Sequence, residues 1–465
     1  MITNRILRLF TVNKLNLKNA ERFYSQKNIL HLHDRGMFQD IFPASHEHEI
    51  KKLLNNSPQC VYAGFDPTAD SLHVGNLLVL MNLLHWQRSG HQVIVLLGGA
   101  TGQIGDPSDR TTERTEINNM IINDNINSIR NNIENIFNNH KLNFWQNNNN
   151  NQKLKQPIVV NNIDWYKNIN IIDFIRNVGK KFRLGTMIGR SSVQTRLNSD
   201  NGMSFTEFSY QIFQAYDWLH LYNKYNCRFQ IGGGDQMGNI VSGHDLISKT
   251  TGNNVYGLTL PLITSEGGKK FGKSLGNAIW LSSNKSSSFS LYQFFMRTKD
   301  SDVDNYLKLF TFLKLDEIKS IINKQNLEPE KRYAQRKLAE QVTLLVHGEE
   351  GLAAAEKATA ILYDNSLESL SKISADELVT VFEGASIYDL PIEPGMTAYD
   401  LAMRIKCFKN DKEAQRILAA GGYYINHSKI INPSEVLTPG IHILKNNTTL
   451  VRVGKKNYHV IRWLV

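Results

Sequence analysis

The chain has 465 residues, of which 41% are hydrophobic and 21% charged, with a formal net charge of +10. This length exceeds a single ordinary core, so two or three domains are expected. No stretch reaches the roughly eighteen uninterrupted apolar residues of a membrane span, which argues against a membrane-embedded protein. The cysteines Cys60, Cys227 and Cys407 are far apart, which disfavours a disulfide framework or a zinc site and predicts buried thiols.

The positive charge lies at the two ends of the chain. Residues 1–30 carry six basic side chains and one acidic, whereas residues 396–465 carry eleven basic and four acidic. The N-terminus is amphipathic and contains arginine, which predicts a mitochondrial transit peptide over residues 1–28; an ordinary surface helix is the alternative. The basic C-terminal end predicts a polyanion as its partner.

From about residue 59, short apolar runs alternate with Gly-rich turns and helical patterns. Residues 60–63 predict a strand, residues 64–76 a turn, and residues 77–88 an apolar helix. Free amides and the positive dipole end at such a helix start favour an anion, most often a phosphate. A strand at 93–97 and a second Gly-rich turn at 98–107 follow. The alternation predicts a doubly wound parallel sheet with both turns opening on one crevice.

Residues 116–170 are rich in asparagine, and their middle, about 138–157, is predicted to be a low-complexity surface loop without function. After this segment, the patterns predict helices at 171–178 and 205–225, strands at 229–231 and 258–263, and a Gly turn at 232–236. The later part predicts helices at 306–313, 316–323, 334–346, 352–362, 398–407 and 411–420, then alternating strands to the C-terminus.

A lysine-rich loop is expected at Lys270-Phe271-Gly272-Lys273-Ser274. With Gly267 it matches the phosphate-loop pattern GxxxxGK[ST], which keeps a P-loop open as an alternative. Gly276 and Asn277 follow where a helix should begin, and this disfavours the P-loop. A mobile loop that presents Lys270 and Lys273 to phosphate oxygens fits the pattern better.

The segment His73-Val74-Gly75-Asn76 resembles the HIGH motif, and the lysine loop resembles the KMSKS motif, of class I aminoacyl-tRNA synthetases. From about residue 30 to its end the chain resembles the bacterial-type and mitochondrial tyrosyl-tRNA synthetases, with Asn76 in place of the second histidine of HIGH. The resemblance implies an α/β fold with four parts: a Rossmann-like catalytic domain at 29–285, a helical anticodon-binding domain at 286–375, a linker at 376–395 and an S4-like RNA-binding domain at 396–465.

The resemblance also implies an activity, tyrosine–tRNA ligation in mitochondrial translation. Tyrosine and ATP would form tyrosyl-adenylate and pyrophosphate, and the tyrosine would then pass to the terminal adenosine of tRNA(Tyr). Mg²⁺ accompanying ATP, a homodimer and a location in the mitochondrial matrix are implied as well. Two alternatives remain at this point: a tryptophanyl-type synthetase, and an RNA-binding or splicing factor built on a synthetase scaffold.

The implied site residues suit their chemistry, and none is expected to bind a metal. Tyrosine would be bound by Tyr62 and Asp217 at its phenol, by Asp106, Tyr210 and Gln214 at its ammonium, and by Gln236 at its carboxyl group. Tyr210, Gln214 and Asp217 share one helix face by spacing alone. ATP would be bound by Gly64, Asp66, His73, Gly75, Asn76, Gly233, Asp235 and Lys273. The pyrophosphate would be stabilised by Thr68, His73, Lys270, Lys273 and Ser274, assisted by Arg110 and Arg114.

Overall fold

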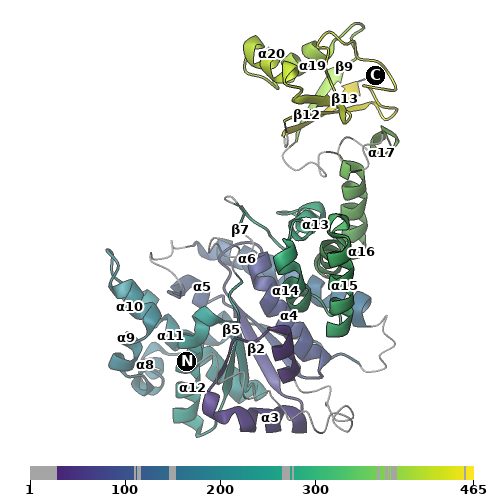
Figure 1. Ribbon diagram of the computed structural model, residues 1–465. Coiled ribbons are helices and arrows are strands. Elements are labelled where there is room, and N and C mark those ends of the chain that lie inside the picture. Colours follow the sequence, from purple (N-terminus) through teal and green to yellow (C-terminus); the bar gives the residue numbers. More distant parts are fainter. Residues whose placement is uncertain are drawn as a thin grey trace. The chain divides into compact units, whose positions relative to one another are not determined.

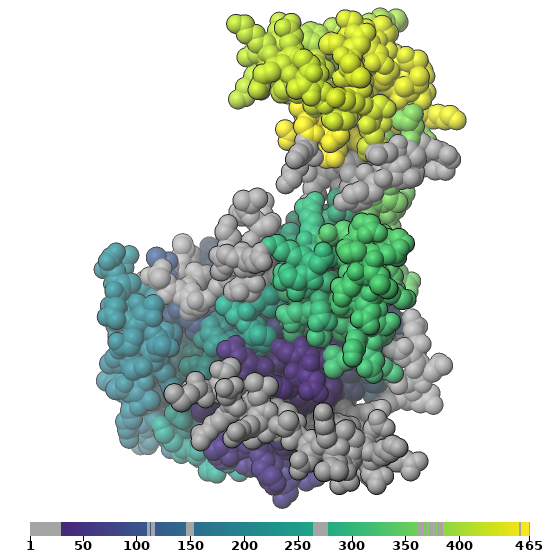
Figure 2. Space-filling model, in the orientation of Figure 1, coloured from purple at the N-terminus to yellow at the C-terminus, as the bar shows by residue number. Residues whose placement is uncertain are grey.

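A computed structural model describes residues 29–108, 112, 117–145, 153–263, 273–274, 277–363, 367–371, 375, 378, 385–454 and 457–464 (Figures 1 and 2). The expected transit peptide and the side chains of Lys270, Arg110 and Arg114 lie outside these residues. Lys273 and Ser274 are described by their backbone only. The chain forms two compact units, Met1–Ser282 with Thr298–Val346, and Ser283–Arg297 with His347–Val465.

The first unit is built on a six-stranded sheet with the order β1-β6-β5-β2-β3-β4. β1 pairs antiparallel with β6, and the other strands run parallel. The order reverses between β2 and β5, which is where ligands bind in doubly wound sheets. The prediction of a parallel α/β core is therefore confirmed. The strands are β1 (Asp40–Phe42), β2 (Cys60–Phe65), β3 (Gln92–Leu97), β4 (Ile158–Asn161), β5 (Phe229–Gly233) and β6 (Tyr256–Leu260).

Helices cover both faces of this sheet (Figure 1). Helix α4 (Val74–Arg88) packs on β2 and β3, whereas α12 (Met237–Thr251) packs on β5 and β6 and also contacts α11 (Phe205–Tyr225). Alternate strand residues such as Tyr62 share a core with Trp218 of α11, the two rings lying 6.0 Å apart. The other elements of the region are η1 (Ile29–Arg35), η2 (Ala44–His46), α3 (Glu47–Asn56), α5 (Thr101–Ile104), α7 (Ile163–Tyr166), α8 (Ile171–Asn177), η5 (Gly179–Lys181), α9 (Leu184–Ile188), α10 (Ser191–Leu197) and η6 (Gly234–Gln236).

The asparagine-rich segment is largely helical. Helix α6 (Asn119–Asn139) continues into a π-helical turn, η3 (His140–Trp145). The expectation of a surface loop was wrong for residues 138–145, whereas residues 146–152 lie outside the described part. The helix forms because one of its faces carries a buried isoleucine every three or four residues, namely Ile122, Ile126, Ile129, Ile133 and Ile136.

Helices follow the sheet. The first unit continues through α14 (Asp300–Phe310), α15 (Leu315–Leu327), η7 (Pro329–Lys331) and most of the first half of α16 (Tyr333–Tyr363). Helix α16 is interrupted at Gly348, whose φ of 72° and ψ of −172° are not helical. This interruption explains why the sequence pattern predicted two helices there, one on each side of residue 348.

The second unit contains α13 (Ser288–Met296), α17 (Leu367–Ser371) and a five-stranded sheet with the order β11-β10-β12-β13-β9. Its strands and helices enclose a separate apolar core that includes Tyr423, Val451 and Trp463. In the described parts of both units, no helix has the length and apolar character needed to cross a membrane. The remaining elements here are β9 (Ser386–Pro391), α19 (Ala398–Arg404), α20 (Asp411–Ala419), β10 (Tyr423–Ile425), β11 (Ser428–Lys429), β12 (Thr448–Val453) and β13 (Asn457–Leu464).

Candidate functional site

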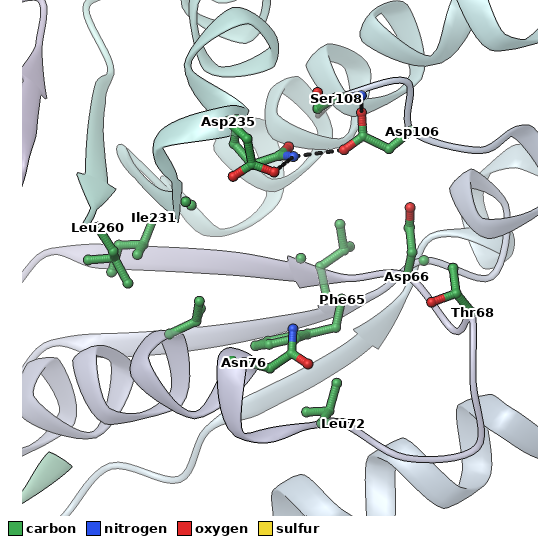
Figure 3. A pocket seen from close by; sticks show the side chains of 18 of the residues that line it. Phe65, Asp66, Thr68, Leu72, Asn76, Asp106, Ser108, Ile231, Asp235 and Leu260 are labelled. Atoms are coloured by element: carbon green, nitrogen blue, oxygen red, sulfur yellow. Dashed lines mark hydrogen bonds between the residues drawn. The ribbon is translucent and has the colours of Figure 1, made fainter. Parts of the chain in front are cut away.

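A cavity of about 450 Å³ lies beyond the carboxyl ends of β2 and β5, where the strand order reverses. Figure 3 shows Asp66, Thr68 and Asn76 on one side of it and Asp106 and Asp235 on the other. It is lined by every expected site residue whose side chain is described: Tyr62, Gly64, Asp66, Thr68, His73, Gly75, Asn76, Asp106, Tyr210, Gln214, Asp217, Gly233, Asp235 and Gln236.

Asp217 of α11 is fully buried and is held by three donors. The indole N–H of Trp165 donates to its Oδ1 at 3.0 Å and the hydroxyl of Tyr166 donates to the same atom at 2.9 Å. The amide of Asn162 donates to Oδ2 at 3.0 Å. Burial raises the pKa of Asp217 to about 7, although these three hydrogen bonds oppose the rise. A carboxylate offers about four acceptor positions, so Oδ2 retains capacity for a ligand.

Tyr62 lines the same end of the cavity from β2. Its hydroxyl is buried and has no hydrogen-bond partner among the described residues. Burial and the nearby charge of Asp217 raise the pKa of Tyr62 well above its usual value, so the hydroxyl remains a donor. Because buried polar groups are nearly always hydrogen-bonded, this hydroxyl facing a cavity indicates a polar ligand atom.

Two further carboxylates stand along the cavity wall. Asp66 accepts from the hydroxyls of Thr101, at 2.7 Å, and Tyr210, at 2.9 Å. Asp106 accepts from the amide of Gln236 at 2.7 Å. Gln214 lies on α11 between Tyr210 and Asp217. Its Oε1 atom is buried and has no hydrogen-bond partner among the described residues. These carboxylates and this amide oxygen form an acceptor-rich region suited to an ammonium group.

The second Gly-rich turn positions the side chain of Asp66. A Cβ atom at Gly98 would lie 2.0 Å from Oδ1 of Asp66, so a larger residue would displace the carboxylate. Thr101, three residues later, supplies one of the two hydroxyl donors to that carboxylate. Glycine is therefore required here for close approach and not for an unusual backbone angle.

The N-terminus of α4 faces the cavity at its other end. The amide oxygen of Asn76 accepts from the backbone N–H of His73 at 3.1 Å and so caps the helix. The N–H of Val74 donates to the carbonyl of Ile279, and that of Asn76 to the carbonyl of His73. Two amides that the sequence suggested were free for an anion are thus already bonded. Side chains at this helix start must therefore carry more of any anion binding than expected.

Described residues on both sides of the lysine loop line this cavity. Ile263 before it and Trp280 after it both line the cavity. After the loop in the sequence, the N–H of Leu281 donates to the carbonyl of Leu72 at 2.8 Å. This is a second backbone hydrogen bond between the two segments, beside that of Val74 with Ile279. The two-residue strand β7 (Lys273–Ser274) pairs antiparallel with β8 (Asn277–Ala278). A hairpin in place of a helix after Lys273 shows that the P-loop alternative was wrong.

The lining of the cavity is acidic. The lining residues of the described chain include Asp66, Asp106, Asp217 and Asp235 but no lysine or arginine. An anionic ligand therefore needs cations from adjacent segments. Ser108 and Ile263, each the last residue described before a segment that contains expected cations, both line the cavity.

Several residues around the site were missed by the sequence reasoning. Asn162, Trp165 and Tyr166 bind Asp217, Thr101 binds Asp66, and Gln230 lines the cavity with a buried Oε1 atom that has no described partner. The pair Asn161-Asn162 at the carboxyl end of β4 carried a usable signal, because polar residues at the carboxyl end of a parallel strand lie near the ligand site. Asn161 and Asn162 were not predicted as site residues because they lie in an asparagine-rich stretch of the sequence.

Known proteins resemble this chain over most of its length. The family model described as tRNA synthetases class I (W and Y) matches residues 54–364. The chain is 52% identical to the mitochondrial tyrosine–tRNA ligase of Drosophila melanogaster, over 96% of this chain and 97% of that protein. It is 45% identical to the mitochondrial tyrosine–tRNA ligase of Homo sapiens, over 92% and 90% of the two chains. A solved structure of C-terminally truncated Aspergillus nidulans mitochondrial tyrosyl-tRNA synthetase matches with a TM-score of 0.66 at 34% identity, covering 72% of this chain and 94% of that one.

Proposed function

The chain belongs to the class I tyrosyl-tRNA synthetases, and from that premise we propose how its cavity binds tyrosine and ATP. The protein is a tyrosine–tRNA ligase that uses ATP as a substrate. The tryptophanyl alternative and that of an RNA-binding factor without ligase activity are not favoured. The observation that carries the proposal is that one cavity joins the Asp217 and Tyr62 pair to the N-terminus of α4.

Tyrosine binds with its phenol toward α11. The substrate hydroxyl donates to the remaining acceptor position on Asp217 and accepts from the unpartnered hydroxyl of Tyr62. Asn162, Trp165 and Tyr166 orient the carboxylate for this contact. Phenylalanine is rejected because it would leave both buried groups without a partner.

The other end of tyrosine binds the acidic wall. Its ammonium group is bound by Asp106, Gln214 and the oxygen of Tyr210, whose own proton is donated to Asp66. Gln236, held against Asp106, approaches the carboxyl group. The adenylate lies against Gly64, Asp66, Gly75, Gly233 and Asp235.

The chemical step needs no enzyme nucleophile. The substrate carboxylate attacks the α-phosphate of ATP, the bond between the α- and β-phosphates breaks, and pyrophosphate leaves. Thr68 and His73 bind the departing pyrophosphate from the α4 side, and Lys270, Lys273 and Ser274 bind it from the lysine loop, assisted by Arg110 and Arg114. Donors aimed at charge that develops in the transition state contribute about 3–4 kcal/mol each.

Mg²⁺ enters with ATP. In the described chain, no group of three or more His, Cys, Asp or Glu side chains could hold a metal ion. This fits an ion that is bound mainly by phosphate oxygens and water, as Mg²⁺ commonly is in nucleotide sites. When bound, it supplies positive charge that partly neutralises the phosphates.

The rest of the chain serves tRNA. The domain limits proposed are a transit peptide at 1–28, a catalytic domain at 29–285 with the asparagine-rich insertion near 138–157, an anticodon-binding domain at 286–375, a linker at 376–395 and an S4-like RNA-binding domain at 396–465. The small α+β module with exposed cations on and beside α19 and α20 supports the last assignment. Since relatives are named mitochondrial, tRNA(Tyr) of the mitochondrial matrix is the proposed partner.

The enzyme acts as a homodimer. Exposed apolar side chains on α8, α9, α10 and the start of α11, here called the apolar patch, support this assignment. These four helices lie close together at one flank of the first unit (Figure 1). Exposed patches of this kind mark protein interfaces. The patch consists of Ile171, Ile172, Ile175, Leu184, Ile188, Leu197 and Phe205.

The proposed activity is tested by the exchange of labelled pyrophosphate into ATP with each of the twenty amino acids. Exchange should depend on tyrosine, with tryptophan and phenylalanine giving little above background. Exchange supported equally by tryptophan would contradict the binding of the phenol by Asp217 and Tyr62.

A further inference from the structure

Helix α6 carries a row of asparagines that the catalytic scheme has not used. Asn125, Asn132 and Asn139 are spaced by seven residues, two helical turns, so they lie along one face. Asn125 is buried and the other two are half-buried. In contrast, Asn131 and Asn138, the neighbours of the last two in the sequence, are exposed.

Each asparagine in this row bonds to a residue outside α6. The amide of Asn125 donates to the carbonyl of Pro67 at 3.0 Å. The hydroxyl of Ser71 lies 2.9 Å from Oδ1 of Asn132 and 2.8 Å from the carbonyl of Leu72, and these two acceptors share its one proton. The amide of Asn139 donates to the carbonyls of Leu345 and Val346, at 3.1 and 3.4 Å.

The first two contacts fall on the turn between β2 and α4. Pro67 immediately precedes Thr68, and Ser71 lies two residues before His73. Ser71 is buried, and its oxygen also accepts a hydrogen bond from the N–H of Ser282, which follows the lysine loop in the sequence. The turn is therefore fixed to α6 on one side and to the segment after the lysine loop on the other.

We propose that Asn125 and Asn132 are positioning residues for ATP, which act by holding the 67–71 turn so that Thr68 and His73 meet the phosphates. Asn139 anchors the far end of the same helix to the carbonyls of α16. This inference rests on the proposed role of Thr68 and His73. A misplaced turn weakens contacts made in the transition state, so the rate of activation falls while tyrosine binding at the other end of the cavity is preserved.

The test compares Asn132→Ala with Asn131→Ala, the matched exposed asparagine. In tyrosine-dependent pyrophosphate exchange, Asn132→Ala should lower kcat/KM for ATP about tenfold and change the KM for tyrosine less than twofold. Asn131→Ala should match the unaltered enzyme. Asn132→Asp keeps the oxygen that faces Ser71 and should recover most of the loss.

A double-mutant cycle separates positioning from general destabilisation. Ser71→Ala combined with Asn132→Ala should be no worse than the poorer single variant, because both remove the same contact. Asn125→Ala is measured beside them, with the melting temperature as a check on folding. Unchanged exchange in Asn132→Ala, an equal fall in Asn131→Ala, or full additivity with Ser71→Ala would overturn the inference. Failure of tyrosine-dependent exchange in the unaltered enzyme would instead reject the proposed function itself.

Discussion

The backbone N–H of Val74 donates a 2.9 Å hydrogen bond to the carbonyl of Ile279. The two residues are far apart in the sequence, yet this bond joins the start of α4 to the segment that follows the lysine loop. His73 and Trp280, the neighbours of the bonded pair, both line the same cavity. The start of α4 and the segment that follows the lysine loop, about 200 residues apart in the sequence, therefore lie beside one cavity.

Removing the acceptor for the substrate phenol should relax specificity. Asp217→Ala is expected to lower discrimination between tyrosine and phenylalanine about 100-fold, because a hydrogen bond to a charged group contributes about 1.5–3 kcal/mol. Tyr62→Phe removes a neutral donor and should cost tenfold or less. The measurement is kcat/KM for each amino acid in pyrophosphate exchange. Tyr222→Phe, on α11 but outside the cavity lining, is the control and should leave the ratio unchanged.

Tyrosine activation should depend on pH through Asp217. Burial raises the pKa of this carboxyl group to about 7, so it becomes protonated as the pH falls below 7 and loses its acceptor position. The value of kcat/KM for tyrosine, which reports the free enzyme, should fall over that range. The hydrogen bond from Tyr166 lowers the pKa, so Tyr166→Phe should move the inflection to higher pH. An inflection that stays in place or moves lower would contradict the assigned role.

The exposed apolar flank should control assembly. Ile172→Asp introduces a charge into the patch and is expected to shift the protein from dimer to monomer in sedimentation velocity at micromolar concentration, because an unpaired charge at an apolar interface is costly. Ile121 on α6 is also an exposed isoleucine but lies outside the patch. Ile121→Asp should remain dimeric, and a dimer in both variants would place the interface elsewhere.

The C-terminal cations should act on tRNA alone. Helix α20 carries the exposed cations Lys412 and Arg416, and the exposed Lys409 lies two residues before its first residue. Replacing all three by alanine should lower kcat/KM for tRNA at least tenfold and flatten its dependence on salt, while pyrophosphate exchange stays within twofold. Arg462→Ala removes a cation that is paired with Asp389 and serves as the control. Equal loss of exchange and charging would count against the RNA-binding role of this module.

Sequence patterns predicted the elements that carry the site because those elements have strong apolar periods. The helix expected at 205–225 matches α11 in both bounds, so the spacing of Tyr210, Gln214 and Asp217 correctly placed them on one face. The Gly-rich turns were also located, because glycine and proline interrupt the periods on each side of them.

Other features depended on contacts that no local pattern encodes. Trp165 and Tyr166 reach Asp217 across about 50 residues of sequence, through the packing of α7 against α11. In α6, the high asparagine content led to the prediction of a loop, although isoleucines repeat there every three or four residues, as in a helix. Two amides expected to be free at the start of α4 are bonded, and one of them is taken by a segment more than 200 residues later.

The central claim is that the phosphates of ATP are bound between the start of α4 and the lysine loop. A crystal structure with tyrosine and a non-hydrolysable ATP analogue tests it most directly. Phosphate oxygens should lie within hydrogen-bond distance of His73 or Thr68 on one side and of Lys270 or Lys273 on the other. Phosphates bound by only one of these segments, with the other turned to a separate surface, would contradict it.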